Sequence, residues 1–172
     1  KRFNFDLIDA LPQITHGGSM RYVICRKGER KISKNLKKLF KEELKLKLNR
    51  RSSCINFKKG CFKSRKRFRK KILKLKKVGK QIVGYAASAK SSTVLNFCKI
   101  NHKHIDFIAD STKEKIGKFT PGTHIPVVSI NHFRKSNPDY TILCSWNHRF
   151  EIFKKEKSYL KKGGKWISHV KI

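Results

Sequence analysis

The spacing of the hydrophobic positions changes once along this chain, near Gly79. Before that point apolar residues recur at intervals of three and four, which predicts two amphipathic helices. The first helix follows Ser33, a suitable N-cap, and the second follows Ser52 and Ser53. Their apolar positions are Leu36, Leu39, Phe40, Leu44 and Leu48, then Cys54, Phe57, Cys61, Phe68, Ile72 and Leu75. Upstream, the segments 5–11 and 20–25 predict a pair of strands.

After Gly79, short apolar runs alternate with helical patterns. Strands are predicted at residues 81–85, 105–109, 126–129, 139–145 and 165–170, and helices near 91–99, 130–135 and 147–162. The alternation predicts an α/β fold with a Rossmann-like, mostly parallel sheet and flanking helices, preceded by the strand pair and the two amphipathic helices. The predicted parts are therefore a strand pair and junction (1–32), two basic helices (33–78) and a Rossmann-like domain (79–172).

The chain is strongly basic. Its 172 residues include 44 Lys and Arg against 11 Asp and Glu, a formal net charge of +33, and residues 26–80 alone contain 25 basic and 3 acidic residues. Such a surface is expected to bind nucleic acid and other polyanions non-specifically at low salt. The segment matches no helix-turn-helix, zinc-finger or RNA-binding motif, and a drift of composition towards lysine would give the same charge. Polyanion binding is therefore kept as an alternative function.

The five cysteines stand singly, without a CxxC pair, which is typical of reduced thiols and predicts neither a disulfide framework nor a metal site. No apolar run approaches the roughly 20 residues of a membrane span, and no charged-then-apolar leader is present. We therefore expect a soluble, cytoplasmic protein without a membrane partner. The chain opens on Lys1 and apolar residues follow at once, so its start is interpreted as a cut edge.

The clearest candidate chemistry lies in GYAASAKSSTVLNFCKI, which runs from Gly84 to Ile100. A buried strand that ends at Gly84 and Tyr85 is followed by a turn of small residues and then by a helix. Free amides and the positive end of the dipole at such a helix start favour an anion, so a phosphate is predicted there with Lys90 as a point charge. The three-glycine dinucleotide fingerprint is missing, so a tight strand-to-helix connection is the alternative.

A second loop reads GKFTPGTHIP from Gly117 to Pro126. We predict that this loop closes over a diphosphate or a sugar, with Thr123 and His124 as donors and a lysine as counter-charge. The alternative is a rigid turn ahead of a buried strand at 125–128. The predicted contact residues here are Lys115, Pro121, Gly122, Thr123 and His124.

Two further groups are candidates for substrate contact. Trp146 and Asn147 follow a strand end, where they would stack on and hydrogen-bond a base or sugar; packing of the tryptophan under the next helix is the alternative. His16 with Gly17 and Gly18 would approach a substrate, because adjacent glycines permit close backbone approach, or would form a solvated loop. The remaining histidines have no acidic or cysteine partner at metal spacing and are expected to be surface or packing residues: His102, His104, His132, His148 and His169.

These motifs resemble one family in their order and spacing. GY.A.AK..T.LN.C.I from Gly84, D....K.GKF.PGTHIPV from Asp110, PDY from Pro138, WN...EI from Trp146 and GGK.I from Gly163 resemble the C-terminal domain of sugar C-methyltransferases, which depend on S-adenosylmethionine (SAM). LP...HGGS.R from Leu11 to Arg21 is similar to the junction that joins this domain to the methyltransferase domain before it.

The resemblance implies that the chain binds a nucleotide-diphosphate sugar. It implies SAM for the full-length family, but this sequence lacks the family's Tyr-His-Glu-His stretch, its glycine-rich cofactor loop and its zinc-binding cysteines. We therefore expect no catalytic residue and no cofactor bound by this chain, and no methyl transfer by the chain alone. A separate SAM-binding catalytic subunit would supply the rest, and an interaction module docking through residues 3–11 is an alternative function.

The sequence departs from the family pattern at three positions. Ala86 and Ser91 stand where the family usually has glycines, and Ile116 stands where it commonly has a polar residue. A Cβ at Ala86 would crowd the approach of a phosphate to the backbone. Together with the missing front half, these departures lead us to expect a split or decaying gene.

Overall fold

The computed structural model describes residues 3–170 of the chain. The chain divides into two compact units, Lys1–Lys59 and Gly60–Ile172. The long helix α2 (Arg51–Lys77) begins in the first unit and continues into the second. The partition of the chain into 1–32, 33–78 and 79–172 stays a prediction.

The first unit is an antiparallel strand pair with one helix packed on it. Strands β1 (Phe5–Gln13) and β2 (Ser19–Arg26) are joined through the 3-10 turn η1 (Thr15–Gly17), and α1 (Lys34–Lys45) follows. The helix starts at Ser33, whose hydroxyl accepts the N–H of Leu36 and donates to Asp9 Oδ1 at 2.7 Å. This bond fixes the start of α1 against β1, and Ile8 and Leu36 are buried.

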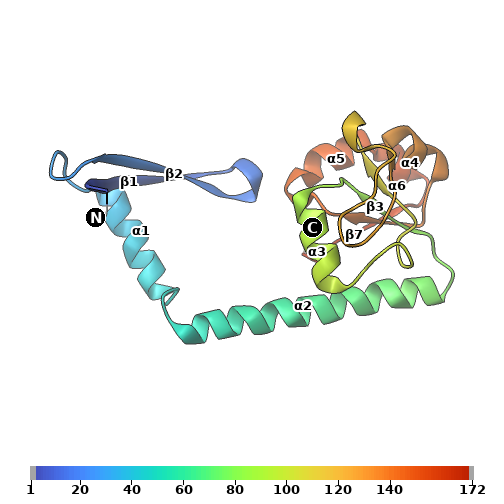
Figure 1. Cartoon of the computed structure of the whole chain (residues 1–172), viewed down its shortest axis with the longest axis horizontal. Coiled ribbons are helices and arrows are strands. Elements are labelled where there is room, and N and C mark those ends of the chain that lie inside the picture. The colour runs from blue at the N-terminus through green and yellow to red at the C-terminus, as the bar shows by residue number, and fades with distance from the viewer. Residues whose placement is uncertain (1–2, 171–172) are drawn as a thin grey trace. The chain divides into compact units, whose positions relative to one another are not determined.

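The second unit holds a five-stranded parallel sheet (Figure 1). Its strands, in the order β5-β4-β3-β6-β7, are β3 (Ile82–Tyr85), β4 (Ile108–Asp110), β5 (Val127–Ser129), β6 (Tyr140–Leu143) and β7 (Lys165–Ile167). The chain runs outward from β3 to β5 and then returns to β6 on the other side of β3, which is the Rossmann order. The predicted fold class is confirmed.

Helices cover both faces of this sheet, as Figure 1 shows. The C-terminal half of α2 and α3 (Ala89–Cys98) pack through Phe68, Ile72 and Leu95 against one face. Helices α4 (Ile130–Ser136), α5 (Arg149–Lys155) and α6 (Lys157–Lys161) pack against the other face. The core on that side includes Phe133 of α4 and Tyr159 of α6. The central strand β3 is therefore buried along its whole length, as a strand covered on both faces must be.

Several predicted boundaries differ from the structure; the strands predicted over 139–145 and 165–170, for example, are the shorter β6 and β7. The helix predicted over 147–162 is instead the 3-10 turn η3 (Trp146–His148) followed by α5 and α6. The break between the two helices falls at Glu156, whose backbone is not helical and whose fully buried carboxylate bonds to Tyr85 and Arg134. The strand predicted over 105–109 is β4 (Ile108–Asp110), and two backbone hydrogen bonds to β3 precede it, from Asp106 N–H to the Ile82 carbonyl and from Gly84 N–H to the Phe107 carbonyl.

All five cysteines are free, and two of them, Cys98 and Cys144, are buried. Burial raises the pKa of the Cys144 thiol to about 12, so it stays protonated at neutral pH. Among residues 3–170, no helix is both long and apolar enough to cross a membrane.

Candidate functional site

The carboxyl ends of three neighbouring strands surround a pocket of about 420 Å³. Tyr85 and Ala86 at the end of β3, Asp110 at the end of β4 and Ser145 after β6 line one side. Helices α4 and α5 and the residues directly before and after α5 line the other side with Arg134, His148, Glu151, Ile152, Lys155 and Glu156. Open α/β sheets bind their ligands at this edge, where the strand order reverses, so the pocket is the first candidate site.

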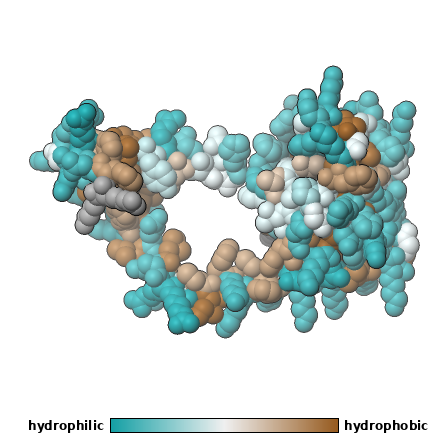
Figure 2. All heavy atoms as spheres, viewed as in Figure 1, coloured by the Kyte–Doolittle hydropathy of each residue, from teal (hydrophilic) through white to brown (hydrophobic). Residues whose placement is uncertain are grey.

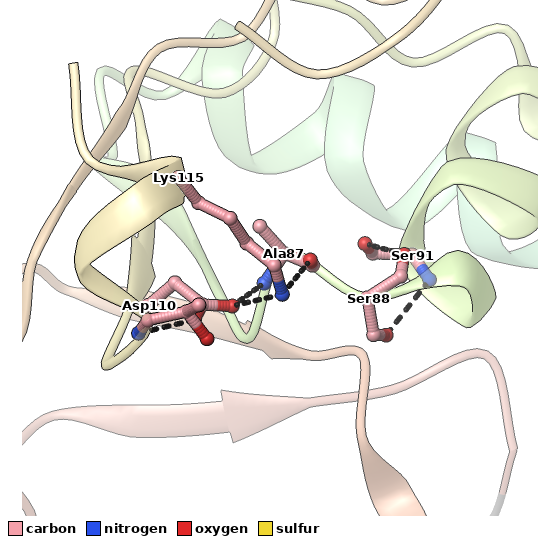
Figure 3. Close-up of polar contacts among 6 residues, drawn as sticks. Ala87, Ser88, Ser91, Asp110 and Lys115 are labelled. Carbon is pink, nitrogen blue, oxygen red and sulfur yellow. Dashed lines mark hydrogen bonds and ion pairs between the residues drawn. The ribbon is translucent and has the colours of Figure 1, made fainter. Parts of the chain in front are cut away.

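The turn between β3 and α3 is closed by a carboxylate (Figure 3). The N–H of Ala87 donates to Asp110 Oδ2 at 2.7 Å, and the N–H of Thr112 donates to Oδ1 at 2.8 Å. Lys115 Nζ donates to the carbonyl of Ala87 at 2.9 Å and lies 3.4 Å from Asp110 Oδ2. Asp110 and Lys115 therefore hold the turn from two sides.

The charge of Asp110 is stabilised by these same partners. Burial by itself would raise its pKa, but the hydrogen bonds from Thr112 and Ala87 and the charge of Lys115 outweigh that effect. The pKa of Asp110 therefore lies below its ordinary value of 3.8, and the carboxylate is ionised at neutral pH.

Helix α3 begins at Ser88, next to the closed turn. Ser88 Oγ accepts the N–H of Ser91 at 3.3 Å, and Ser91 Oγ donates to the Ser88 carbonyl at 2.5 Å (Figure 3). Within residues 3–170 the N–H groups of Ala89 and Lys90 have no hydrogen-bond partner. These two amides and the positive end of the helix dipole can hold an anion.

A second pocket, of about 260 Å³, lies between the start of α3 and the segment 115–121. It is lined by residues of both elements, among them Ser88, Ala89, Lys115, Lys118 and Pro121. Two of the predicted contact residues, Lys115 and Pro121, therefore lie beside the helix start that was predicted to hold a phosphate.

Three predicted site residues from two separate elements are brought together. Lys90 Nζ donates to Asn147 Oδ1 at 2.7 Å and lies 5.7 Å from the centre of the Trp146 ring. Lys90 belongs to the first turn of α3, and the other two belong to η3, directly after β6. Strands β3 and β6 are neighbours on either side of the reversal in strand order, which is why these side chains meet.

Gly84 and Tyr85 lie inside β3 and are buried. A Cβ on Gly84 would stand 2.7 Å from Cγ1 of Ile108, so the glycine allows β4 to approach β3. The backbone with positive φ in the turn belongs to Ala86, at +72°. Gly84 therefore allows the two strands to pack closely. The left-handed conformation that glycine favours occurs at Ala86 instead.

Tyr85 belongs to a cluster of hydrogen-bonded polar side chains that lines the first pocket. Its hydroxyl donates to Glu156 Oε1 at 2.9 Å, and Arg134 binds both Glu156 oxygens at 2.9 and 3.0 Å. Burial and the hydrogen bond to Glu156 raise the pKa of Tyr85 well above its usual range, so it remains a neutral donor. The bidentate pair leaves Arg134 half-exposed at the pocket wall.

The loop from Gly117 to Pro126 is held by its own hydrogen bonds. Thr123 is buried with its hydroxyl 2.7 Å from Thr120 Oγ1, and Thr120 Oγ1 accepts the N–H of Ile125. Gly122 has φ +72° and lies against Asn96 of α3. Neither Gly122, Thr123 nor His124 lines either of the two pockets.

His16, Gly17 and Gly18 lie in the first unit, at the exposed turn between β1 and β2. All three have positive φ, at 56°, 84° and 122°. The structure describes them within that unit only, so their predicted contact with a substrate stays a prediction.

Four residues outside the predicted contact residues hold the site together: Ser88, Asp110, Arg134 and Glu156. A signal existed for Asp110, because the quoted motif pairs it with Lys115 five residues later. No local signal existed for Glu156, whose partners lie 22 and 71 residues away. Within residues 3–170 no three histidine, cysteine or acidic side chains gather as a metal site would require.

Comparison with known proteins gives two findings. A family model described as "C-methyltransferase C-terminal domain" matches residues 14–170. C-methyltransferase NovU from Streptomyces niveus is 40% identical over 89 residues, which cover 52% of this chain and 21% of NovU. The chain therefore matches about a fifth of the length of that relative.

Proposed function

This chain belongs to the family of C-methyltransferase C-terminal domains, and on that premise we propose that it binds the nucleotide-diphosphate sugar of a SAM-dependent sugar C-methyltransferase. One observation carries the proposal above all. Lys90, Trp146 and Asn147 meet where the strand order reverses. None of the three lines the pocket of about 420 Å³, but Ser145 and His148, which flank Trp146 and Asn147 in the chain, do. This is the position at which sheets of this topology hold nucleotides.

The groups around this point match the parts of such a ligand. The unpartnered N–H groups of Ala89 and Lys90 suit a diphosphate, and the Lys90 ammonium adds a positive charge. Trp146 presents a half-buried ring on which a base or sugar would stack, and Asn147 can both donate and accept. The 420 Å³ pocket, with Arg134 and Ser145 on its wall, would take the sugar.

We infer that this chain does not bind SAM, because the carboxylate at the usual ribose position is engaged by the chain itself. In nucleotide-binding sheets of this order an acidic side chain at the end of the second strand binds the ribose hydroxyls. Here that residue is Asp110, and both of its oxygens accept backbone N–H groups of the chain itself. We therefore derive no methyl-transfer step and propose that the chain alone is inactive.

Catalysis would then need a separate SAM-binding subunit. The first unit offers a surface for it, because Phe5, Tyr22 and Ile24 of the strand pair are exposed. The chain mixed with SAM and a thymidine-diphosphate hexose should form no methylated sugar by mass spectrometry. Methylated product from the purified chain would overturn the proposed inactivity.

Tryptophan fluorescence tests the sugar-nucleotide site directly. The chain has two tryptophans, and Trp166 packs on Tyr85 and Tyr159 with its indole N–H unpaired. Trp166→Phe therefore leaves Trp146 as the only reporter. A thymidine-diphosphate hexose should quench this emission with a saturable, one-site curve, and the same titration of Trp146→Phe should leave the emission unchanged. No quench in Trp166→Phe, or an equal quench in Trp146→Phe, would contradict the proposed site.

A further inference from the structure

One face of α2 in the second unit consists entirely of cations. Six residues recur at helical spacing between positions 63 and 77, and at about 100° per residue they fall within roughly a 100° arc. All six are exposed, and the face opposite them carries the buried Phe68 and Ile72. We call this face the α2 stripe: Lys63, Lys66, Arg67, Lys70, Lys74 and Lys77. Figure 2 shows hydrophilic side chains projecting from the outer side of α2.

The acidic residues of the second unit are occupied elsewhere. Five of its six carboxylates form ion pairs outside the stripe: Asp106 with Lys76, Asp110 with Lys115, Asp139 with Lys80, Glu151 with Lys155 and Glu156 with Arg134. The sixth, Glu114, lies in the short turn η2 (Lys113–Lys115). Across the described chain no stripe cation has an ion-pair partner. Like charges three and four residues apart repel, so an external anion would stabilise the helix.

We propose that the α2 stripe docks on the phosphate backbone of duplex DNA. This inference is independent of sugar-nucleotide binding, since the stripe lies on α2 and contributes to neither pocket. From residue 63 to 77 the stripe spans about 21 Å, and a duplex carries about 12 negative charges over that length. Every stripe side chain is a donor without an acceptor, which suits phosphate contacts and predicts no sequence preference.

The side chains around the stripe disfavour other anionic partners. A helix on a lipid surface inserts its apolar face, but Phe68 and Ile72 are buried in the core of the unit. Single strands need exposed aromatic rings for stacking; the stripe has none, and the neighbouring Phe62 packs edge-to-face on Phe97 of α3. Protein interfaces rely on central aromatic or aliphatic anchors, which the stripe also lacks.

Binding of the full chain to a labelled 20-base-pair DNA duplex tests the proposal by fluorescence anisotropy. The stripe variant is Lys66→Gln/Lys70→Gln/Lys74→Gln. Its charge-matched control is Lys154→Gln/Lys157→Gln/Lys161→Gln, which changes three exposed lysines on the helices of the opposite sheet face. At about 0.1 M salt the stripe variant should bind at least about 30-fold more weakly, and its salt slope should fall by about 2.7. The control should change affinity less than about threefold.

Three results would overturn the proposal. Equal losses in the stripe variant and the control would show that total charge alone binds DNA. Stripe-dependent binding to phosphatidylserine vesicles, or to a 20-nucleotide single strand, that is tighter than binding to the duplex would assign the stripe to another partner. Failure of Lys66→Arg/Lys70→Arg/Lys74→Arg to keep the affinity within about threefold would contradict recognition by charge.

Discussion

Ala86 holds a left-handed backbone at the residue where the chain leaves the central strand, with φ +72°. The family resemblance places a glycine here, and the structure gives the physical reason for that preference. A Cβ makes this conformation unfavourable by about 1–2 kcal/mol. Because Ala86 N–H donates to Ala109 and Ala87 N–H donates to Asp110, the conformation is fixed from both sides despite its cost.

Ala86→Gly should therefore stabilise the protein. The strain energy relieved in the folded state is larger than the entropic cost of ordering a glycine, which has more freedom in the unfolded chain. The free energy of unfolding should therefore rise by about 0.5–1 kcal/mol. Ala87→Gly, one residue later and without positive φ, should lower it by about the same amount. Urea unfolding at neutral pH measures both, and equal effects of the two substitutions would contradict strain at Ala86.

Asp110 is the residue whose ionisation the turn requires. Its folded pKa lies below the ordinary value of 3.8, so the stability that it contributes is complete above about pH 4. That contribution is lost as the pH falls through the folded pKa, because the protonated carboxyl group is neutral and accepts the two backbone N–H groups less strongly.

Asp110→Asn should lower the free energy of unfolding at pH 7 by about 1–3 kcal/mol, since one amide and Lys115 lose their charged acceptor. Between pH 5 and pH 3 the variant should lose less stability than the parent chain. Glu114→Gln, an exposed neighbour in η2, should keep the parental pH dependence. Urea unfolding across this range measures all three, and a variant with the parental slope would refute the role of Asp110.

At the scale of elements, the approach of β4 to β3 depends on one glycine. Gly84 lies where a Cβ would meet the fully buried Ile108 at 2.7 Å. Overpacking at such a site usually costs about 1–3 kcal/mol, because neither strand can move without disturbing the sheet.

Gly84→Ala should therefore destabilise the protein by about 1–3 kcal/mol, and part of that loss should disappear when Ile108 is truncated. In a double-mutant cycle with Ile108→Ala, the coupling free energy should be at least about 1 kcal/mol. Gly60→Ala, in an open position of α2, should instead stabilise by about 0.5–1 kcal/mol. Additive effects of Gly84→Ala and Ile108→Ala in thermal or urea unfolding would contradict the close contact.

Periodicity predicted every strand of the sheet, because buried parallel strands are short apolar runs between helical segments. It failed at Glu156, where α5 and α6 separate, since that break comes from hydrogen bonds to Tyr85 and Arg134. Local sequence carries no information on such distant partners. The need for a small side chain at Gly84 was also beyond local sequence, because the close contact comes from Ile108 of β4, 24 residues later.

At the scale of the whole molecule, strand order brings some predicted site residues beside one another. Lys90, Trp146 and Asn147 meet because β3 and β6 are neighbours, which the α/β pattern predicts. Thr123 shows what the pattern could not provide, because its hydroxyl bonds to Thr120 inside the loop and reaches neither pocket. Motifs thus located the loops, and tertiary packing decided which side chains face the pockets.

The net charge of +33 makes salt the decisive variable for the central claim. The most direct measurement is a calorimetric titration of the full chain with a thymidine-diphosphate hexose at about 0.15 M and about 0.6 M salt, where screening differs strongly. Lys90→Ala is the test variant, and Lys103→Ala, an exposed lysine between α3 and β4, is its charge-matched control. A sugar-nucleotide site predicts one-site binding at both salt levels that weakens about tenfold or more in Lys90→Ala and stays unchanged in Lys103→Ala. Heat that vanishes at the higher salt, or falls equally in both variants, would contradict it.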